Sequence, residues 1–280
     1  MKDRQDGRIV LQFEEAFRFE NPRISAASGL LLFNGHFFCV SDDELGLIRV
    51  PLSLKGPAQR ISLFEGVLPE GAKARKKLKP DLEAIVQLPE TGAILCIPSG
   101  SKPNRSRGAL LDIDLKAQEV SFEKIYSKLN DQIPDLNLEG AIIQDSKISL
   151  LQRGNGRAGK NAIASLSLED FLMDQPGDFG ITEVELGEIH GERLGFTDAC
   201  FHQGAIWFLA VAERTQSTYE DGEFAGAILG RLDSKFRMDY RLEVSIPFKP
   251  EGLVIQERSV FVVTDADDRS VVSRMYRARI

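Results

Sequence analysis

Acidic side chains recur along this chain at a nearly constant spacing, each followed by a small residue and an apolar run. The copies begin at Glu83, Glu139, Asp198 and Glu251, and a fifth at Ser28 has a hydroxyl in place of the carboxylate. Successive copies are 55, 56, 59 and 53 residues apart. Oxygen ligands of this kind suit Ca²⁺, with Mg²⁺ second and zinc disfavoured. The sequence therefore predicts a cation held by Ser28, Glu83, Glu139, Asp198 and Glu251.

The same pattern has a second interpretation. The small residue after each acid can let neighbouring strands approach closely, while water solvates the acids. We favour the cation because equivalent positions of a repeat are expected to face one another around a central channel. Four carboxylates that meet in such a partly desolvated channel repel one another unless some take up protons or a cation neutralises them.

The near-constant spacing predicts a repeat architecture, in which each copy is one supersecondary unit. Each acid precedes a short apolar strand, a turn such as Asn34-Gly35 and a second strand, and third and fourth strands follow. The fifth unit ends after three strands, and the segment 8–13 can supply the fourth. We therefore predict an all-β protein with a single domain, 1–280, folded as a five-bladed β-propeller whose last blade an N-terminal strand completes. A six-bladed propeller is the alternative, although no sixth copy of the motif is found.

Two further segments have local interpretations. We predict that residues 168–180 form a short helical insertion and that Lys73 to Lys79 form a solvated loop.

The loops that follow the second strands should surround the predicted cation on one end of the propeller. They carry Asp42, Asp43 and Asp265, which we predict as catalytic carboxylates acting on water. Histidine is not expected there, because His36 and His202 adjoin turns at the opposite end. Arginine side chains on these loops can bind an anion through paired donors. The predicted substrate-binding residues are Arg105, Arg153 and Arg157.

In these residues the chain resembles the soluble calcium-activated nucleotidases (apyrases), and phytase-like and lactonase-like propellers share the idea of a central calcium. The resemblance implies a five-bladed propeller with one Ser or Glu ligand from each blade. Asp198 departs from the Ser expected at the fourth place. The stretch Asp42-Asp43-Glu44-Leu45-Gly46 is similar to a family motif, but it lacks that motif's Arg and Thr. We expect the chain to belong to an uncharacterised bacterial propeller family that is related to these enzymes.

Composition narrows the possible partners. The chain has 280 residues and a net charge of −7, which argues against general nucleic-acid binding. No apolar run reaches the length of a membrane span, and the first residues lack the apolar segment of a secretory signal. The three cysteines are widely spaced and suit reduced packing residues. We expect a cytoplasmic protein with a small anionic ligand, and the sequence carries no signal for its oligomeric state.

The function that we predict is metal-assisted hydrolysis of a phosphate-containing or other anionic ester. Two alternatives stay open: a non-catalytic ligand- or protein-binding propeller with a structural cation, and a lactonase-like esterase. A requirement for calcium in turnover as well as in stability would separate the enzyme from the binding protein.

Overall fold

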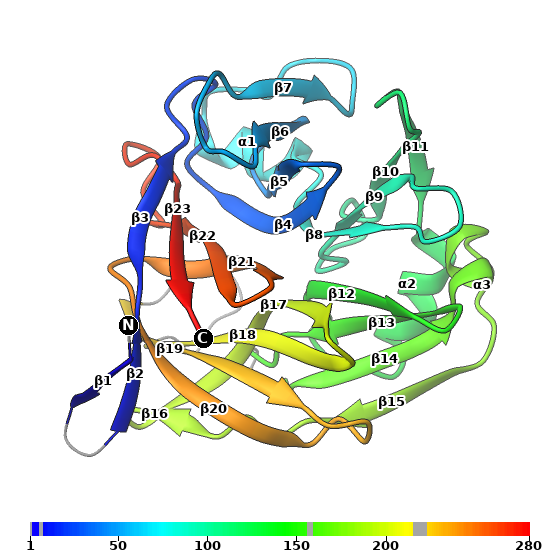
Figure 1. The fold of residues 1–280 in the computed structure, drawn as a ribbon. Helices are drawn as coiled ribbons and strands as arrows, with labels where there is room; N and C mark the ends of the chain where they lie inside the picture. Colours follow the sequence, from blue (N-terminus) through cyan, green and yellow to red (C-terminus); the bar gives the residue numbers. More distant parts are fainter. Residues whose placement is uncertain (1, 6–7, 156–158, 215–222) are drawn as a thin grey trace.

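Five sheets surround a central axis in the computed structural model, which describes residues 2–5, 8–155, 159–214 and 223–280 (Figure 1). Within each sheet the strand nearest the axis is followed outward by its successors in the chain. The first blade comprises β4 (Ala27–Phe33), β5 (His36–Ser41), β6 (Gly46–Pro51) and β7 (Gln59–Ser62). The second comprises β8 (Leu82–Gln87), β9 (Ile94–Pro98), β10 (Arg107–Leu111) and β11 (Ala117–Ser121). The predicted five-bladed propeller is confirmed.

The remaining blades follow the same order. The third comprises β12 (Leu138–Gln144), β13 (Lys147–Gln152), β14 (Ala162–Ser167) and β15 (Phe179–Glu183). The fourth contains the long strands β17 (Glu192–His202), β18 (Ala205–Arg214), β19 (Glu223–Leu232) and β20 (Met238–Ser245), with the short β16 (Glu188–Ile189) beside β17. The fifth comprises β21 (Lys249–Gln256), β22 (Ser259–Asp265), β23 (Arg274–Arg279) and, from the other end of the chain, β3 (Glu14–Arg18).

An N-terminal strand completes the last blade, as predicted, but it is not the segment 8–13. β3 pairs antiparallel with β23, with Phe17 opposite Met275. The expected segment forms β2 (Arg8–Gln12), which pairs in parallel with β20 of the fourth blade and forms a hairpin with β1 (Lys2–Gln5). The physical reason is the apolar pattern: Leu11 is fully buried in the cluster between the fourth and fifth blades, whereas β3 is an outer strand whose polar residues give a weak sequence signal.

The hydrophobic core is divided among the gaps between neighbouring blades. Each of the five gaps holds one cluster of buried apolar side chains drawn from the two sheets that face it. Phe37 of the first blade packs on Phe261 of the fifth with ring centroids 4.8 Å apart. The core therefore fixes how the blades are placed around the axis.

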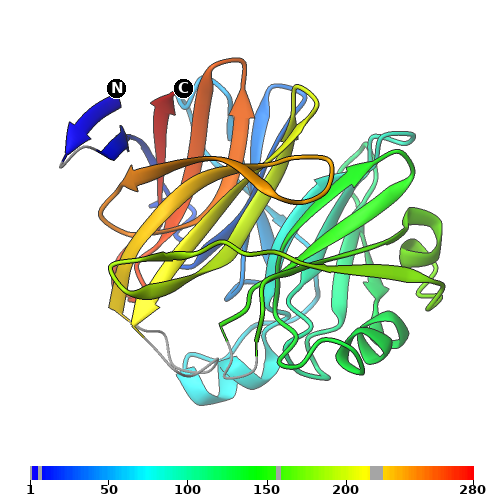
Figure 2. The same ribbon diagram turned by 90° about the horizontal axis from the view of Figure 1, so that it is seen from below.

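Among the described residues, three short helices decorate this framework. α3 (Leu168–Leu172) confirms the predicted helical insertion. α2 (Glu123–Asn130) packs three buried residues against the second and third blades. Lys73 to Lys79 is not a loop: α1 (Ala72–Leu78) spans most of it, and both α1 and α2 lie at the same end of the propeller (Figure 2). In the described part of the chain, no helix has the length and apolar character needed to cross a bilayer.

The five inner strands form a closed ring, each in contact with the inner strands of its two neighbours. Every inner strand also has a break in its pairing register at or beside the predicted ligand position, near the start of the strand except in the longer β17, where it lies near the middle. A β-bulge of this kind re-aims a side chain that would otherwise point into a sheet face. These breaks gather polar side chains at one end of the axis.

The inner strands approach so closely that some positions exclude any side chain. A Cβ atom on Gly252 would lie 2.4 Å from the backbone oxygen of Ser28 on the neighbouring inner strand. One on Gly140 would lie 3.1 Å from the backbone of Asp198. The small residue after the ligand position is thus required by packing, as the second interpretation of the motif held.

We expect Gly252→Ala to lower the free energy of unfolding by about 1–3 kcal/mol, because the added methyl forces two inner strands apart. Gly180→Ala is the matched control, since a Cβ there meets no atom within 4 Å. Urea denaturation of both variants would measure the difference. Equal stability of the two variants would contradict the close approach.

Candidate functional site

A cavity of about 120 Å³ lies on the axis at the end where the inner strands begin. Its lining residues are all polar or charged, and they come from every blade. Among them, eight carboxylates face five lysine or arginine side chains, which leaves a formal excess of three negative charges. We call this cavity the axial pocket. It lies where the loops after the second strands converge, the end predicted for the site.

Four of the five predicted ligands line the axial pocket: Ser28, Glu83, Glu139 and Glu251. Asp198 does not. In the fourth blade the register break falls between Phe196 and Asp198, so the residue equivalent to the glutamates is Thr197.

Both residues of the fourth blade have structural partners. Thr197 donates its hydroxyl to the backbone oxygen of Pro250 at 2.8 Å. The Asp198 carboxylate accepts backbone N–H groups of Ala199 at 2.8 Å and of Leu253 at 2.7 Å. Burial raises the pKa of Asp198 well above its usual range. Asp198 thus ties β17 to β21 beside the pocket instead of lining it.

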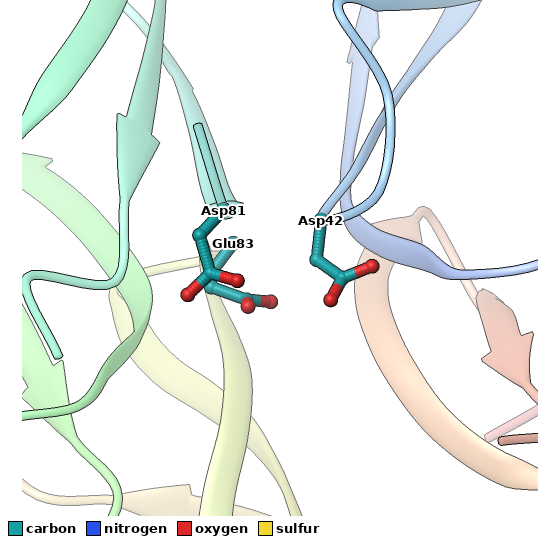
Figure 3. Close-up of side chains that lie close together, drawn as sticks. All are labelled: Asp42, Asp81 and Glu83. Atoms are coloured by element: carbon teal, nitrogen blue, oxygen red, sulfur yellow. The ribbon is translucent and has the colours of Figure 1, made fainter. Parts of the chain in front are cut away.

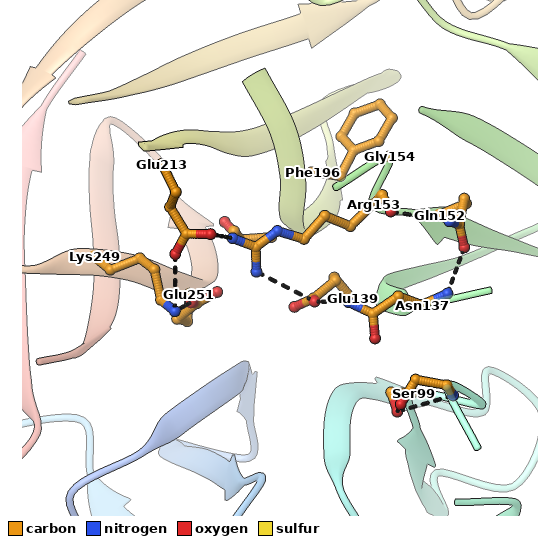
Figure 4. Close-up of polar contacts among 12 residues, drawn as sticks. Ser99, Asn137, Glu139, Gln152, Arg153, Gly154, Phe196, Glu213, Lys249 and Glu251 are labelled. Atoms are coloured by element: carbon orange, nitrogen blue, oxygen red, sulfur yellow. Dashed lines mark hydrogen bonds and ion pairs between the residues drawn. The ribbon is translucent and has the colours of Figure 1, made fainter. Parts of the chain in front are cut away.

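One half of the pocket is an ion-pair network centred on Arg153 and Lys249 (Figure 4). Arg153 lies between two carboxylates, 2.6 Å from Glu213 and 3.3 Å from Glu139. Lys249 lies 3.2 Å from Glu213 and 3.1 Å from Glu251. Although burial opposes ionisation of Glu213, the two cations hold its pKa below its usual value. The chain itself thus supplies two positive charges to these three acids.

Asp42, Asp81 and Glu83 form the other half of the pocket, which we call the acidic triad. Asp42 faces the other two carboxylates across the pocket (Figure 3). Within the described residues, this is the group whose ligand atoms all lie within 4.8 Å of one another. The three ring glutamates thus do not converge into one metal shell, and the closest set of oxygens includes two aspartates from the surrounding loops.

The counterions of the acidic triad are unevenly shared. Lys79 bridges Asp42 and Asp81, with its Nζ 3.0 Å from Asp81. Asp81 also accepts from Arg105 at 2.8 Å and from the Ser99 hydroxyl at 2.5 Å. The Glu83 carboxylate has no hydrogen bond or ion pair with any described residue. One carboxylate oxygen of Asp42 is buried without a hydrogen-bond partner. Uncompensated charge is therefore concentrated at Glu83 and Asp42.

The pKa values of these acids are shifted in the direction that this uneven pairing predicts. Burial, together with Glu139 and Asp81 nearby, raises the pKa of Glu83 well above its usual value. Burial also raises the pKa of Glu251, whose Oε2 is buried without a partner. The pKa of Asp42 is raised for the same first reason, even though Lys79 opposes the shift. Buried acids of this kind either hold protons or await a cation.

The predicted catalytic aspartates have different surroundings. Asp42 and Asp265 line the axial pocket. Burial raises the pKa of Asp265 to about 7. Asp43 lies outside the axial pocket, paired with Arg75 at 2.8 Å and Arg269 at 3.3 Å. Asp43 thus anchors two surface segments, and a catalytic role for it stays a prediction that its ion pairs disfavour.

The predicted substrate-binding arginines are already engaged. Arg153 and Arg105 are buried, and their terminal nitrogens contact carboxylates of the pocket. Arg157 lies outside the described residues. Anion binding by these side chains stays a prediction, whereas neutralising the acids is what their geometry does.

Sequence reasoning missed eight residues that line the pocket: Lys76, Lys79, Asp81, Asn137, Asn155, Glu213, Lys249 and Asp267. Three of them had a detectable signal, because Asp81, Asn137 and Lys249 each lie two residues before a predicted ligand and therefore point the same way along the strand entry. Lys79 was hidden in a basic run, and Glu213 had no local signal.

Removal of Arg153 tests the network. Arg153→Met leaves Glu139 and Glu213 buried without their shared cation, so we expect the free energy of unfolding to fall by about 3–5 kcal/mol. Lys160→Met, which breaks an ion pair exposed on both sides, should cost less than about 1 kcal/mol. Adding Glu139→Gln to Arg153→Met should recover part of the loss in denaturant unfolding. Equal costs for the two single variants would contradict a buried network.

The raised pKa of Asp265 predicts a pH-dependent stability. The folded protein holds a proton on this carboxyl that the unfolded chain releases above about pH 4, so its contribution is lost as the pH rises through about 7. We expect Asp265→Asn to be more stable than the wild type at pH 8, by on the order of 1–3 kcal/mol, and to lose that advantage near pH 4. Chemical denaturation of the EDTA-treated proteins across this range measures it. An advantage independent of pH would contradict the shift.

Known proteins share the overall fold of this chain. Solved structures that are similar to this chain include a luciferin-regenerating enzyme, at 11% identity over 92% of each chain with a TM-score of 0.50. A structure from the GH130 family of mannoside phosphorylases is 11% identical over 99% of this chain and 93% of its own, with a TM-score of 0.52. Identities this low show the propeller fold alone. A comparison with curated protein sequences finds no match.

The profile of a family described as "Family of unknown function (DUF6929)" matches residues 23–280, which span all five inner strands and every described residue of the axial pocket. The protein therefore belongs to the DUF6929 family.

Proposed function

We propose that the axial pocket binds a divalent cation, Ca²⁺ first and Mg²⁺ second, and that with this cation the protein hydrolyses a small anionic ester. The observation that carries the proposal is the excess of buried carboxylates over cations in the pocket. Isolated buried charge is costly, and one divalent cation would remove most of this excess.

The residues of the pocket fit such an ion. Among the described residues, the Glu83 carboxylate has no hydrogen-bond or ion-pair partner and one oxygen of Asp42 is buried without a hydrogen bond, and both belong to the acidic triad. Glu251 contributes an independent sign, because its side chain is 7% exposed and its Oε2 lacks a partner in the same cavity. All the available donors are hard oxygens, which Ca²⁺ and Mg²⁺ prefer. A calcium role was also implied by the resemblance to calcium-activated nucleotidases, which rests on sequence alone.

A bound cation would supply the positive charge that an anionic ester needs in an acidic pocket. The chain's own residues supply the rest. Asp265, with a pKa of about 7, is suited to accept a proton from an attacking water near neutral pH. Arg105 and Lys79 lie at the edge of the acidic triad, where they limit the repulsion between an anionic substrate and the aspartates. In the overall reaction water adds across the ester bond and releases an acid and an alcohol.

The cavity volume limits what the pocket itself can hold. About 120 Å³ accommodates a phosphate- or carboxylate-sized group with a few waters, given that one water occupies about 30 Å³ of liquid. A second cavity of about 240 Å³ opens beside it and shares Asp42 and Asp265 with it. The organic part of the ester would lie in this outer cavity.

A non-catalytic binding protein is the second candidate, and one observation favours it. Each acid of the Arg153–Lys249 network is paired with at least one of these two buried cations, an arrangement that resembles structural support more than a catalytic apparatus. In that case the cation would hold the blades together, and a ligand would bind above it.

A substrate screen on the EDTA-stripped protein with Ca²⁺ or Mg²⁺ distinguishes the hydrolase from the non-catalytic binding protein. The panel would contain aryl phosphates, nucleotides, lactones and aryl glycosides, the last because a neighbour of the same fold comes from a glycoside-processing family. We expect cation-dependent turnover of a phosphate ester. Asp265→Asn should lower kcat by about 10²- to 10⁴-fold while cation binding persists, and Glu83→Gln should weaken the cation-induced rise in melting temperature.

Asp178→Asn is the matched control, because Asp178 is exposed and lines neither the axial pocket nor the outer cavity. Cation binding without turnover on any substrate would support the binding protein. Absence of cation binding in the wild type would overturn the proposal altogether.

A further inference from the structure

Helix α1 is unusual among the elements around the pocket because none of its residues is buried. It is seven residues long, too short to be stable alone, so its position depends on contacts with the rest of the protein. The Asn104 amide donates to the Lys77 backbone oxygen at 3.0 Å, and two side chains of the helix and its C-terminal end provide further contacts. Arg75 pairs with Asp43 at 2.8 Å and donates to the backbone oxygens of Leu68 and Pro69. Lys79, which caps the C-terminal end, is the other anchor.

The Lys79 anchor lies in the acidic triad. Its side chain is 11% exposed, and its Nζ contacts both Asp42 and Asp81. Burial opposes the charge of this lysine, but Asp42 and Asp81 raise its pKa overall, so it remains an ammonium ion. The ammonium group therefore occupies the space between two of the three carboxylates that could hold a divalent cation.

We propose that Lys79 is an internal competitor for this cation, and that the cation, by displacing Lys79 from Asp42 and Asp81, releases the C-terminal end of α1. The inference rests on the proposed cation site. The two positive groups cannot share the same carboxylate oxygens, because they would repel one another at the short distances of the triad. The cation's affinity is therefore reduced by the free energy that holds Lys79 in place.

The release has a consequence for access. Lys76 and Lys79 line both the axial pocket and the outer cavity, so the end of α1 forms part of the wall between them. Movement of this end widens the connection. The cation thereby prepares the space for the organic part of a substrate and frees an ammonium group close to the incoming anion. Arg75 keeps the rest of α1 in place, since its partner Asp43 is not part of the triad.

Lys79→Met tests the competition. The probe is Ca²⁺ alone, titrated by calorimetry into the EDTA-stripped full-length protein. We expect the Kd for Ca²⁺ to fall by about tenfold or more, because the competing ion pairs are gone. Lys79→Gln, which keeps a hydrogen-bond donor but no charge, should shift the Kd in the same direction and guards against misfolding of the methionine variant. Lys77→Met is the matched control: it removes the same charge from the exposed face of α1 and should leave the Kd within about twofold.

Limited trypsin digestion of the wild-type protein measures the release of the C-terminal end of α1 without the need for a variant. The sites are the bonds after Lys76 and Lys77, whereas Pro80 protects the bond after Lys79. Ca²⁺ should accelerate cleavage at these two sites at least about fivefold. In Lys79→Met cleavage should already be fast without Ca²⁺.

The outcomes separate this inference from the proposal beneath it. Ca²⁺ binding with equal Kd in the wild type and both Lys79 variants, and with unchanged cleavage of α1, overturns the competition and leaves the cation site standing. Binding to the Lys79 variants but not to the wild type supports the competition in its strongest form. Failure of every protein to bind Ca²⁺ or Mg²⁺ overturns both.

Discussion

The structure around the axis depends on one electrostatic constraint: carboxylates that are removed from water must be neutralised. The repeat places acids at the start of successive inner strands, and the propeller brings them together whether or not their charges are balanced. Each additional cation in the pocket follows from that requirement. An acidic chain with a net charge of −7 nevertheless places Lys79, Arg105, Arg153 and Lys249 at its centre, where desolvation would otherwise exclude them.

The backbone makes this concentration of charge possible. The register breaks turn polar side chains toward the axis, and residues as small as Gly140 and Gly252 let neighbouring inner strands come into direct contact. The five apolar clusters between blades then hold the ring closed against the repulsion of the acids. The free energy for assembling a polar centre therefore comes from the apolar packing that surrounds it.

Sequence spacing was enough to predict the blades, because one motif per blade is a property of local sequence. It also located four of the five ring positions. It failed at Asp198 by a single residue: the bulge moves Thr197 into the equivalent place, and a register break cannot be read from an apolar pattern that continues through it. Lys79 and Glu213 were not predicted as site residues for another reason. Their roles depend on segments from different blades that converge only in the folded chain, and no local sequence pattern indicates which charged side chain will be buried.

The two halves of the pocket differ in how firmly their counterions are held, and this difference decides where exchange can occur. Lys249 belongs to β21, and Arg153 follows β13 and fits against Gly195, where a Cβ would lie 2.9 Å from its Cγ. Displacing either cation would disturb a central strand or its packing. Lys79 ends a helix without buried side chains, so its withdrawal disturbs no part of the apolar core. An incoming cation that must replace an internal one will therefore do so at the acidic triad, because the folded framework opposes it least there.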